Sequence, residues 1–169
     1  MKEKDQNAWK YRQFLWRSWA IQASWNYERQ MNMGFMYGIA PILDNIYKNP
    51  EDEAMKKEAY ERHMMYYNCT PQTSAFVLGL TASMEEQYYE DQENFNPESI
   101  SAVKTSLMGP LSGVGDSFFQ GTIRVLAFGL GINLAQQGSI LGPILAMLIS
   151  FVPSFLVTYY GEKTGYNMR

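Results

Sequence analysis

Charged side chains are almost absent from the C-terminal part of this chain. The segment from Thr105 to Gly161 contains 57 residues but only two formal charges, Asp116 and Arg124. Such a long apolar stretch is typical of membrane-embedded helices. A charge at the bilayer centre costs roughly 2.5–3.5 kcal/mol on insertion scales, so charged residues there normally face a protein interior or a watery path. Asp116 and Arg124 therefore indicate where function is expected.

The two parts of the chain differ in composition. The mean hydropathy of −0.30 resembles that of a soluble protein only because it averages a charged first part with the nearly uncharged stretch. We expect residues 1–104 to form an amphipathic, largely interfacial helical region and residues 105–169 to be membrane-embedded. The net charge of −3, without a Lys/Arg patch, argues against nucleic acid as a partner. Cys69 is the only cysteine, which excludes an intramolecular disulfide and a metal site built from a cysteine cluster.

The N-terminal segment does not predict a secretory signal peptide, because it lacks an apolar core of about 7–15 residues. Residues from about Asn7 to Met33 instead favour one long amphipathic helix rich in aromatic side chains such as Trp16 and Trp25. This composition suits a helix at the membrane interface. A helix packed on a soluble core would show the same pattern.

Two helix starts are legible in the sequence, at Asn49-Pro50-Glu51 and at Asn96-Pro97-Glu98. Asparagine caps free backbone N–H groups, proline is tolerated in the first turn, and acidic residues complement the positive end of a helix. We predict that the first of these helices ends near Asn68, because Pro71 disfavours helical geometry at the residue before it.

A further helix is predicted from about Gln72 to Asp91, with acidic residues at its C-terminal end. Acidic side chains there oppose the helix dipole, so they are expected either to meet a partner or to be solvated. Glu85 and Glu86 are adjacent, and neighbouring helical positions diverge by about 100°, so a shared catalytic carboxylate site is not expected.

The uncharged part does not resemble one simple membrane span. Ile123 to Ala135 is shorter than the roughly 20 residues that cross hydrocarbon, so it is expected to be a re-entrant or partly embedded arm. Ile140 to Tyr160 is long enough, but Pro143 and Pro153 are expected to introduce a kink or a break. Strand signals are weak throughout. The predicted fold class is an all-α membrane protein with amphipathic N-terminal helices and broken or re-entrant apolar helices.

The glycine-rich segment from Leu107 to Asp116 lacks the Gly-Lys-Ser/Thr ending of a phosphate-binding loop, so no nucleotide cofactor is expected. Gly109, Gly113 and Gly115 are expected to allow close helix packing, or to let broken helix ends present backbone dipoles to a polar substrate.

Asp116 and Arg124 lie eight residues apart. A turn around Gly121-Thr122 would bring them together as a structural ion pair, which a sugar hydroxyl or a partner subunit could share. His63 is the only histidine. Without a nucleophile motif or a carboxylate at triad spacing, it favours a structural role over a phosphohistidine or general-base role.

The run from Trp25 to Arg29 is dense in aromatic and hydrogen-bonding side chains. Aromatic rings can cover the apolar face of a sugar while Asn26, Glu28 and Arg29 hold its hydroxyls. Packing of a helix with an interfacial tryptophan would use the same residue types.

Several separate motifs follow one another in the order found in a known family. The chain resembles the IID component of the mannose-fructose-sorbose family of the bacterial phosphoenolpyruvate-dependent sugar phosphotransferase system. The resemblance rests on Arg17-Ser18, Gln22 to Arg29, Gly34-Phe35, Arg62-His63, Tyr67-Asn68, Pro71, Glu85-Glu86, Leu107 to Asp116, Gly121-Thr122 with Arg124, and Tyr159-Tyr160-Gly161. Such components usually continue for roughly another hundred residues, so the chain looks like the N-terminal part of one.

The resemblance implies a non-catalytic permease subunit in the bacterial cytoplasmic (inner) membrane. It would pair with a IIC subunit to translocate a mannose-type hexose, which the cytoplasmic IIA and IIB phosphoryl carriers phosphorylate during uptake. No cofactor or metal is implied. The polar residues expected nearest the route are Asn26, Glu28, Arg29, Asp116, Thr122 and Arg124.

Two other classes of protein remain compatible with the residues alone. One is a non-transporting interfacial scaffold that binds a membrane partner and uses its embedded charges structurally. The other is a soluble helical enzyme whose uncharged part is buried in a protein core.

Overall fold

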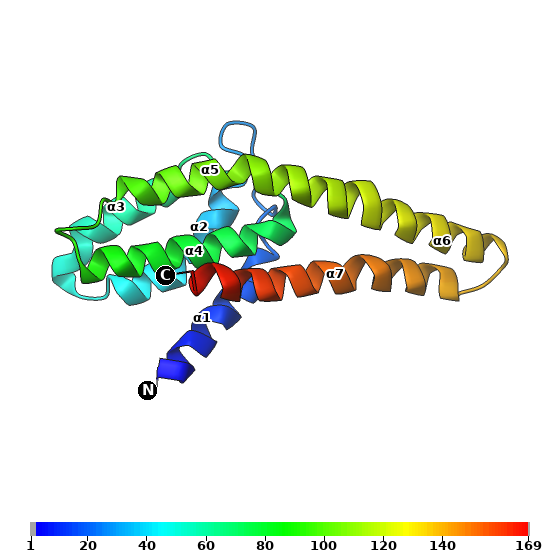
Figure 1. Cartoon of the computed structure of the whole chain (residues 1–169), viewed down its shortest axis with the longest axis horizontal. Helices are drawn as coiled ribbons and strands as arrows, with labels where there is room; N and C mark the ends of the chain where they lie inside the picture. Colours follow the sequence, from blue (N-terminus) through cyan, green and yellow to red (C-terminus); the bar gives the residue numbers. More distant parts are fainter. Residues whose placement is uncertain (1–2, 169) are drawn as a thin grey trace.

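The computed structural model of the chain describes residues 3–168, and side chains from residue 7 onward. Within these residues the fold is all-α and contains no β-strand, as predicted. Figure 1 shows a bundle of shorter helices from which two long antiparallel helices extend as a hairpin. We call the extended part of this hairpin, residues 116–160, the apolar arm.

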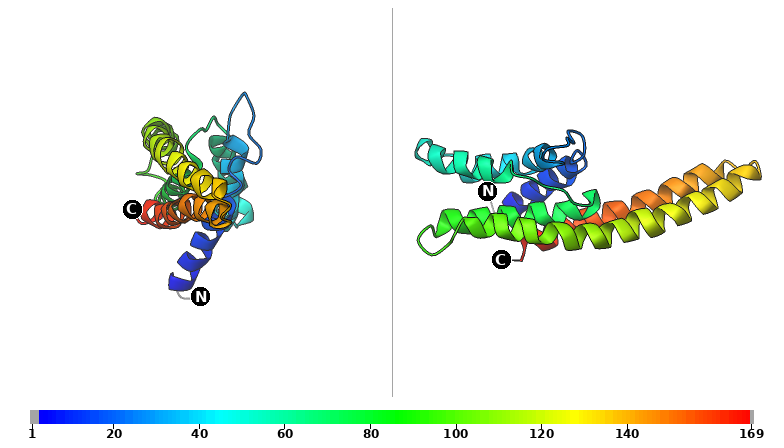
Figure 2. Two further views of the ribbon diagram at one scale, coloured as in Figure 1. Left: turned by 90° about the vertical axis from the view of Figure 1, so that its right-hand side faces the viewer. Right: turned by 90° about the horizontal axis from the view of Figure 1, so that it is seen from above.

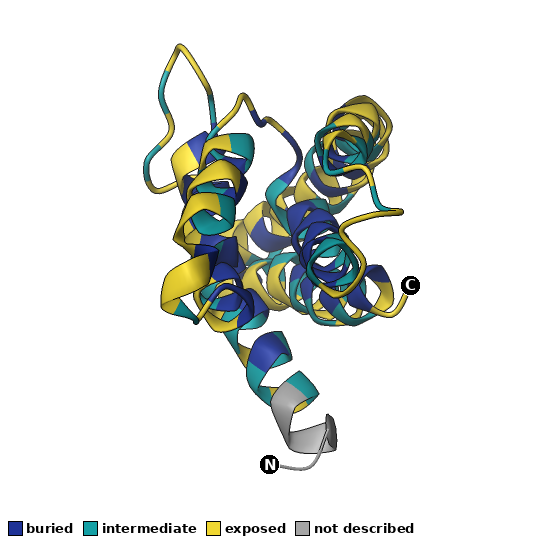
Figure 3. Ribbon diagram, turned by 90° about the vertical axis from the view of Figure 1, so that its left-hand side faces the viewer, coloured by how far each residue is buried: buried dark blue, intermediate teal, exposed yellow. Residues whose placement is uncertain are grey.

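The bundle is built from the first elements of the chain together with the C-terminal end of the last helix. Its core is formed by aliphatic and aromatic side chains from these helices and the loops between them, including the fully buried Phe14, Phe35, Ile42 and Leu78. Figure 3 shows the buried positions facing inward between these helices. The elements are α1 (Glu3–Ser18), α2 (Asn32–Ile46), the short 3₁₀ helix η1 (Pro50–Asp52), α3 (Glu53–His63) and α4 (Pro71–Glu90).

The predicted helix starts are confirmed. Pro50 opens η1, which leads directly into α3, and the Asp52 carboxylate accepts hydrogen bonds from the backbone and side-chain nitrogens of Asn49. The Asn96 side chain accepts from the backbone N–H of Glu98 (2.9 Å), the first residue of α5 (Glu98–Gly115). α4 spans nearly the range predicted for it. Local capping chemistry therefore determines these boundaries.

The prediction of one helix from Asn7 to Met33 is wrong, because α1 ends at Ser18 and α2 begins only at Asn32. The intervening residues 19–31 form a loop. This loop folds back on the start of α2: a Cβ at Gly34 would lie 2.0 Å from the carbonyl oxygen of Ile21. Only glycine allows this approach, so a tertiary contact replaces the helix that composition favours.

The helix that begins near Pro50 was predicted to end near Asn68. This prediction is also wrong, because α3 ends at His63. The backbone N–H of Tyr67 donates to Arg29 O (3.3 Å), and the N–H of Met31 donates to Tyr67 O (2.8 Å). Lys104 Nζ donates to the carbonyl of His63 (3.1 Å). These long-range hydrogen bonds divert the chain from the helix several residues before Pro71.

The segment from Ile123 to Ala135 is not a separate short arm. α5, the π-helical stretch η2 (Asp116–Ile123) and α6 (Arg124–Gln136) form one helix of 39 residues. The irregularity in this apolar helix is the π-helical stretch, and no turn occurs at Gly121. Figure 2 shows the helix running without interruption from the bundle to the tip of the arm.

α7 (Leu141–Tyr166) returns from the tip as a single helix of 26 residues, and neither proline breaks it. Pro143 lies in the first turn, where a missing N–H costs no helical hydrogen bond. Pro153 lies inside the helix. At the next residue, the Ser154 hydroxyl donates to Ser150 O (2.8 Å), so an additional side-chain hydrogen bond lies beside the lost backbone bond.

The arm presents apolar side chains outward. Only 17% of the most apolar window of residues 98–136, and 11% of that of α7, is buried within the chain. Both helices are long and apolar enough to cross a membrane. A soluble protein rarely exposes so large an apolar patch. The large exposed side chains on the arm include Val125, Leu126, Phe128, Leu130, Ile132, Ile144, Met147, Leu148, Phe151 and Val152.

The inner end of α7 is anchored to α4 by close backbone contact. A Cβ at Gly79 would lie 2.3 Å from Glu162 O, and a Cβ at Gly165 would lie 2.1 Å from Phe76 O. Small residues let these two helices approach as they do in membrane proteins. By contrast, Gly109 and Gly113 have no atom within 4 Å of a Cβ, so of the three glycines expected to support packing only Gly115, next to Thr70, does so within the chain.

Candidate functional site

The predicted polar residues near the N-terminus lie in the loop of residues 19–31. The Asn26 side chain donates to Gln30 O (3.3 Å) and to Asn32 Oδ1 (3.1 Å), and accepts from the backbone N–H of Arg29 (2.8 Å). Asn26 therefore holds the loop together. Gln30 adopts a positive φ of 57°, which helps the chain reverse.

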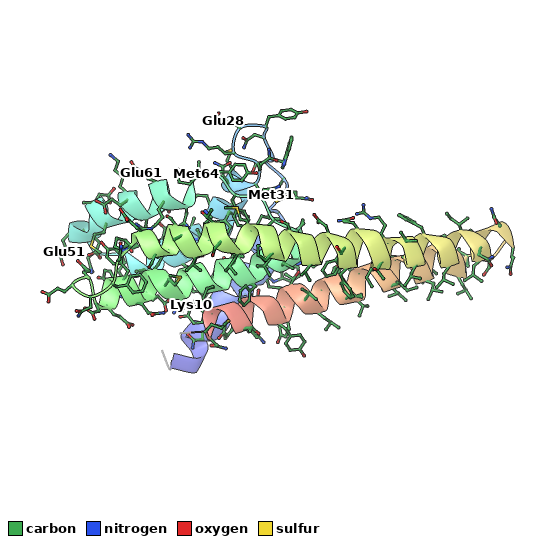
Figure 4. The ribbon with its side chains drawn as sticks, turned by 45° about the horizontal axis from the view of Figure 1, so that its top comes forward. Lys10, Glu28, Met31, Glu51, Glu61 and Met64 are labelled. Carbon is green, nitrogen blue, oxygen red and sulfur yellow. The ribbon has the colours of Figure 1, made fainter. Side chains whose placement is uncertain are left out.

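Glu28 and Arg29 face solvent at the surface of this loop. Their side chains are 83% and 49% exposed, and 3.6 Å separates the Glu28 carboxylate from Arg29 Nε. Figure 4 shows Glu28 on the projecting loop, beyond Met31 and Met64 at its base. Trp25 and Tyr27 contact each other edge to face (4.8 Å between centroids). The loop thus presents a charged pair beside two aromatic rings.

The other three predicted residues lie along the arm, and the expected ion pair between Asp116 and Arg124 is not formed. The Asp116 carboxylate instead accepts from the hydroxyl of Thr70 (2.7 Å). Thr122 donates to Ser117 O (3.2 Å), five residues earlier, as suits a π-helical stretch. Because the helix is continuous, eight residues place Asp116 and Arg124 about 12 Å apart along its axis.

Arg124 lines a polar cavity of about 220 Å³ at the base of the arm. A second cavity of about 90 Å³ adjoins it and shares Gln72, Gln120 and Arg124. No described side chain forms a hydrogen bond or ion pair with the guanidinium of Arg124. The first cavity also contacts Ser18, Trp19, Gln22, Pro71 and Thr158.

A buried ionic cluster joins three helices around Glu85. Arg62 donates to both carboxylate oxygens (2.8 and 3.0 Å), His63 Nε2 lies 2.9 Å from Oε1, and the Tyr47 hydroxyl donates to Oε2 (2.8 Å). The Glu85 and His63 side chains are fully buried. Burial raises the pKa of Glu85, but the hydrogen bonds from His63 and Arg62 outweigh it and lower that pKa to about 2.

A second cluster lies on a different face of α4. Lys10 Nζ contacts Glu86 Oε1 (2.5 Å) and the Tyr166 hydroxyl (2.6 Å), and that hydroxyl also donates to Glu86. Figure 4 shows Lys10 where α1 crosses the end of α7. Glu85 and Glu86 thus serve two separate clusters, as their diverging directions predict. The acidic end of α4 meets partners within the chain, at least for these two carboxylates.

Comparison with known proteins decides the family. The sequence profile described as "PTS system mannose/fructose/sorbose family IID component" matches residues 7–168. The chain belongs to this IID family. The resemblance carried by the sequence motifs is thereby confirmed.

Curated relatives of the IID chain come from several bacteria. It is 38% identical to the PTS system mannose-specific EIID component of Escherichia coli over 151 residues, which cover 89% of this chain and 52% of the relative. It is 37% identical to the fructose permease IID component of Bacillus subtilis over 150 residues, covering 89% of this chain and 53% of the relative. The chain therefore spans about half the length of the curated relatives it matches.

A solved structure supports the same assignment. The IID chain superposes on a chain in the cryo-EM structure of the mannose transporter ManYZ in complex with a microcin, with a TM-score of 0.87 and 36% identity. The match covers 93% of this chain and 56% of that chain. The IID chain is accordingly a membrane protein, and its exposed apolar arm is explained by that environment.

Sequence reasoning missed two sets of residues in the IID chain. The Glu85 cluster could have been suspected from two acids at the negative end of a helix together with a single histidine. Gln72 and Gln120 carry no charge, so a count of formal charges passes over them. The feature that could have identified Gln72 and Gln120 is that each is a polar residue next to, or within, an apolar segment.

The His63 environment predicts acid sensitivity. Burial lowers the pKa of His63 to about 4, below its ordinary value of 6.5. The folded IID chain keeps this imidazole neutral while the unfolded chain takes up a proton, so stability falls as pH decreases from 6.5 towards 4, by on the order of 3 kcal/mol. Thermal unfolding of the detergent-purified full-length protein at a series of pH values measures this loss. In His63→Gln the fall in stability over this interval should be smaller than in the unmodified protein by this amount, and an unchanged pH dependence would contradict the assignment.

Proposed function

We propose that the chain serves in a IID permease subunit that forms, with a IIC subunit, the translocation unit for a mannose-type hexose. Cytoplasmic IIA and IIB carriers would phosphorylate the sugar during uptake, and the subunit itself would make no covalent bond. The membership of the IID family carries this proposal. The hexose class follows the mannose- and fructose-specific names of its relatives.

The exposed apolar arm supports the proposed environment and partnership. Lipid and a IIC subunit would cover its outward side chains in the bacterial inner membrane, with residues 105–169 embedded and most of residues 1–104 at the interface. Trp16 is 68% exposed on the amphipathic helix α1, which suits the interfacial position proposed for the first region.

The subunit would contribute by positioning the sugar rather than by chemistry. We propose that the route passes the polar residues at the base of the arm, where Arg124 is open to a cavity and Asp116 and Thr122 lie on the same helix. The loop that carries Asn26, Glu28 and Arg29 would form a second polar surface along the route.

Uptake of radiolabelled mannose tests this proposal. The full-length parent protein would be coexpressed with its IIC subunit and supplied with IIA, IIB and phosphoenolpyruvate in membrane vesicles. We expect uptake to require all of these components. Replacing Asp116 by Asn and Arg124 by Gln together should lower uptake about tenfold, because a polar route loses both formal charges.

A matched control removes one acid and one base elsewhere. Lys57 and Glu61 form an exposed pair on α3, with side chains 75% and 68% exposed, and Lys57→Gln with Glu61→Gln should leave uptake unchanged. Unchanged uptake in the Asp116/Arg124 double variant would remove these residues from the route. Membrane association without any sugar dependence would favour the scaffold instead.

A further inference from the structure

The cavities at the base of the apolar arm bring together polar groups that are distant in the sequence. Gln72 comes from the first turn of α4, Gln120 from the π-helical stretch, and Arg124 from the start of α6. Ser154 and Thr158 approach from α7. Taken together, the cavities lie near the lower limit of small-molecule pockets in proteins, which span about 300–1,000 Å³.

The amide groups in these cavities are poorly satisfied. The Oε1 atoms of Gln72 and Gln120 are buried and have no hydrogen-bond partner among the described residues. The Nε2 atom of Gln72 makes one long bond to Ser154 Oγ (3.4 Å). Buried polar atoms normally have partners, because an unsatisfied one costs about 1–3 kcal/mol. Two such atoms beside one guanidinium indicate that something else completes the site.

The hydroxyls of Ser154 and Thr158 do not supply the hydrogen bonds that the glutamine oxygens lack. The Ser154 and Thr158 hydroxyls donate to the carbonyls of Ser150 (2.8 Å) and Ser154 (2.9 Å) in their own helix, which leaves only their oxygen lone pairs free. The site therefore offers acceptors at the two glutamine oxygens and the hydroxyls, and donors at Arg124 and at the amide nitrogen of Gln120. A complementary ligand must both donate and accept hydrogen bonds.

The depth of the cavity along the arm argues against a lipid phosphate as that ligand. Thirteen residues of α7 separate Ser154 from Leu141 at the tip, which corresponds to about 20 Å of helix. With the tip near one interface, this depth lies inside a hydrocarbon core about 30 Å thick, whereas phosphates remain at its surface.

We propose that the cavity bounded by Gln72, Gln120 and Arg124 holds the hydroxyl groups of the transported sugar. This assignment rests on the proposed permease function and deepens it by naming the groups that contact the substrate. Sugar hydroxyls both donate and accept, so they satisfy the amide oxygens and the guanidinium together. A carboxylate from a partner subunit would pair with Arg124 but would bring no donor for Gln72 or Gln120.

An aromatic wall completes the site. Trp19 lines the larger cavity, is 47% exposed, and stacks on Phe151 of α7 (5.7 Å between centroids). An indole ring provides an apolar surface for the C–H face of a sugar ring while its neighbours bind the hydroxyls. π-helical insertions frequently occur at functional sites, and here the insertion carries Gln120.

The test uses the full-length protein in complex with its IIC subunit, and mannose as the probe. Gln72→Met and Gln120→Met keep an unbranched side chain of similar size but remove the hydrogen-bonding amide. We expect each to raise the KM for mannose uptake about tenfold, because a sugar hydroxyl loses its partner. Gln136→Met, on the same helix but near the tip, is the matched control and should leave KM unchanged.

Deoxy analogues separate direct contact from altered packing. In the unmodified complex, at least one monodeoxymannose should compete less well than mannose. In the variant that lost the corresponding partner, this analogue and mannose should compete equally, because the two changes remove the same hydrogen bond. Recovery of the IIC subunit with each variant serves as the folding control.

Three results would overturn the proposal. The first is that the loss caused by each deoxy analogue and the loss caused by each variant simply add. A cavity that holds water instead of sugar would give this result. The second is loss of the IIC subunit from Arg124→Gln while both glutamine variants keep the normal KM, which would indicate a partner carboxylate. In both cases the permease function stands if the unmodified complex transports mannose. The third, no mannose uptake by the unmodified complex, would overturn the site and the function together.

Discussion

Replacing Glu85 by glutamine is expected to destabilise the folded chain by about 3–5 kcal/mol. The substitution keeps the size of the side chain but removes the charge that neutralises Arg62. The guanidinium of Arg62 remains with a side chain only 10% exposed, and its two hydrogen bonds to the carboxylate lose their ionic character. The cost is large because a charge is left in the interior without its counterion.

Thermal unfolding of the detergent-purified full-length protein, followed by tryptophan fluorescence, measures this loss. Glu58→Gln is the matched control, because Glu58 is exposed on α3 and should tolerate the change. Combining Glu85→Gln with Arg62→Gln should cost much less than the sum of the single changes, because both charges are then removed. Additive losses would show that Arg62 and Glu85 do not stabilise the fold as a pair.

Local signals in the sequence predict the elements whose ends are determined locally. Asn49 and Asn96 mark helix starts because an amide beside a proline and an acid satisfies the first backbone groups of a helix. Pro71 occupies the first position of α4, where the missing N–H of proline costs no helical hydrogen bond. The all-α class follows from the weak strand signals, and the membrane character follows from the apolar stretch.

Boundaries determined by tertiary contacts could not be predicted in this way. α1 ends at Ser18 because residues 19–31 pack on Gly34 and pair with the backbone around Tyr67. No pattern within residues 7–33 indicates that this loop contacts Gly34 or Tyr67. Ile123 to Ala135 was too short to span a bilayer by itself, but the preceding helix extends it to 39 residues.

The candidate site shows the same division. Arg124 was predicted from the rarity of charge in an apolar segment, and it does face a polar cavity. Its expected partner was wrong, because pairing with Asp116 required a turn that the π-helical stretch does not make. Gln72 and Gln120 lie 48 residues apart in the sequence, so their meeting depends on how α4 packs against the arm.

The close contact between α4 and α7 predicts a second large effect, from Gly165→Ala. A methyl group at this position would lie 2.1 Å from Phe76 O and 3.0 Å from Leu80 N, both backbone atoms of α4. Backbone cannot rotate away as a side chain can, so the two helices must separate. We expect a loss of about 3 kcal/mol, at the upper end of the usual cost of overpacking, even though alanine favours a helix more than glycine does.

Gly129→Ala provides the matched control in the same protein. Gly129 also lies inside an apolar helix, but no atom lies within 4 Å of a Cβ there, so alanine should leave stability unchanged or raise it slightly. The thermal unfolding temperature in detergent measures both variants. Because the contact of Gly165 anchors the inner end of α7, Gly165→Ala should also lower uptake by moving Ser154 and Thr158 relative to Gln72. Equal unfolding temperatures for the two alanine variants would mean that α4 and α7 are not held by this contact.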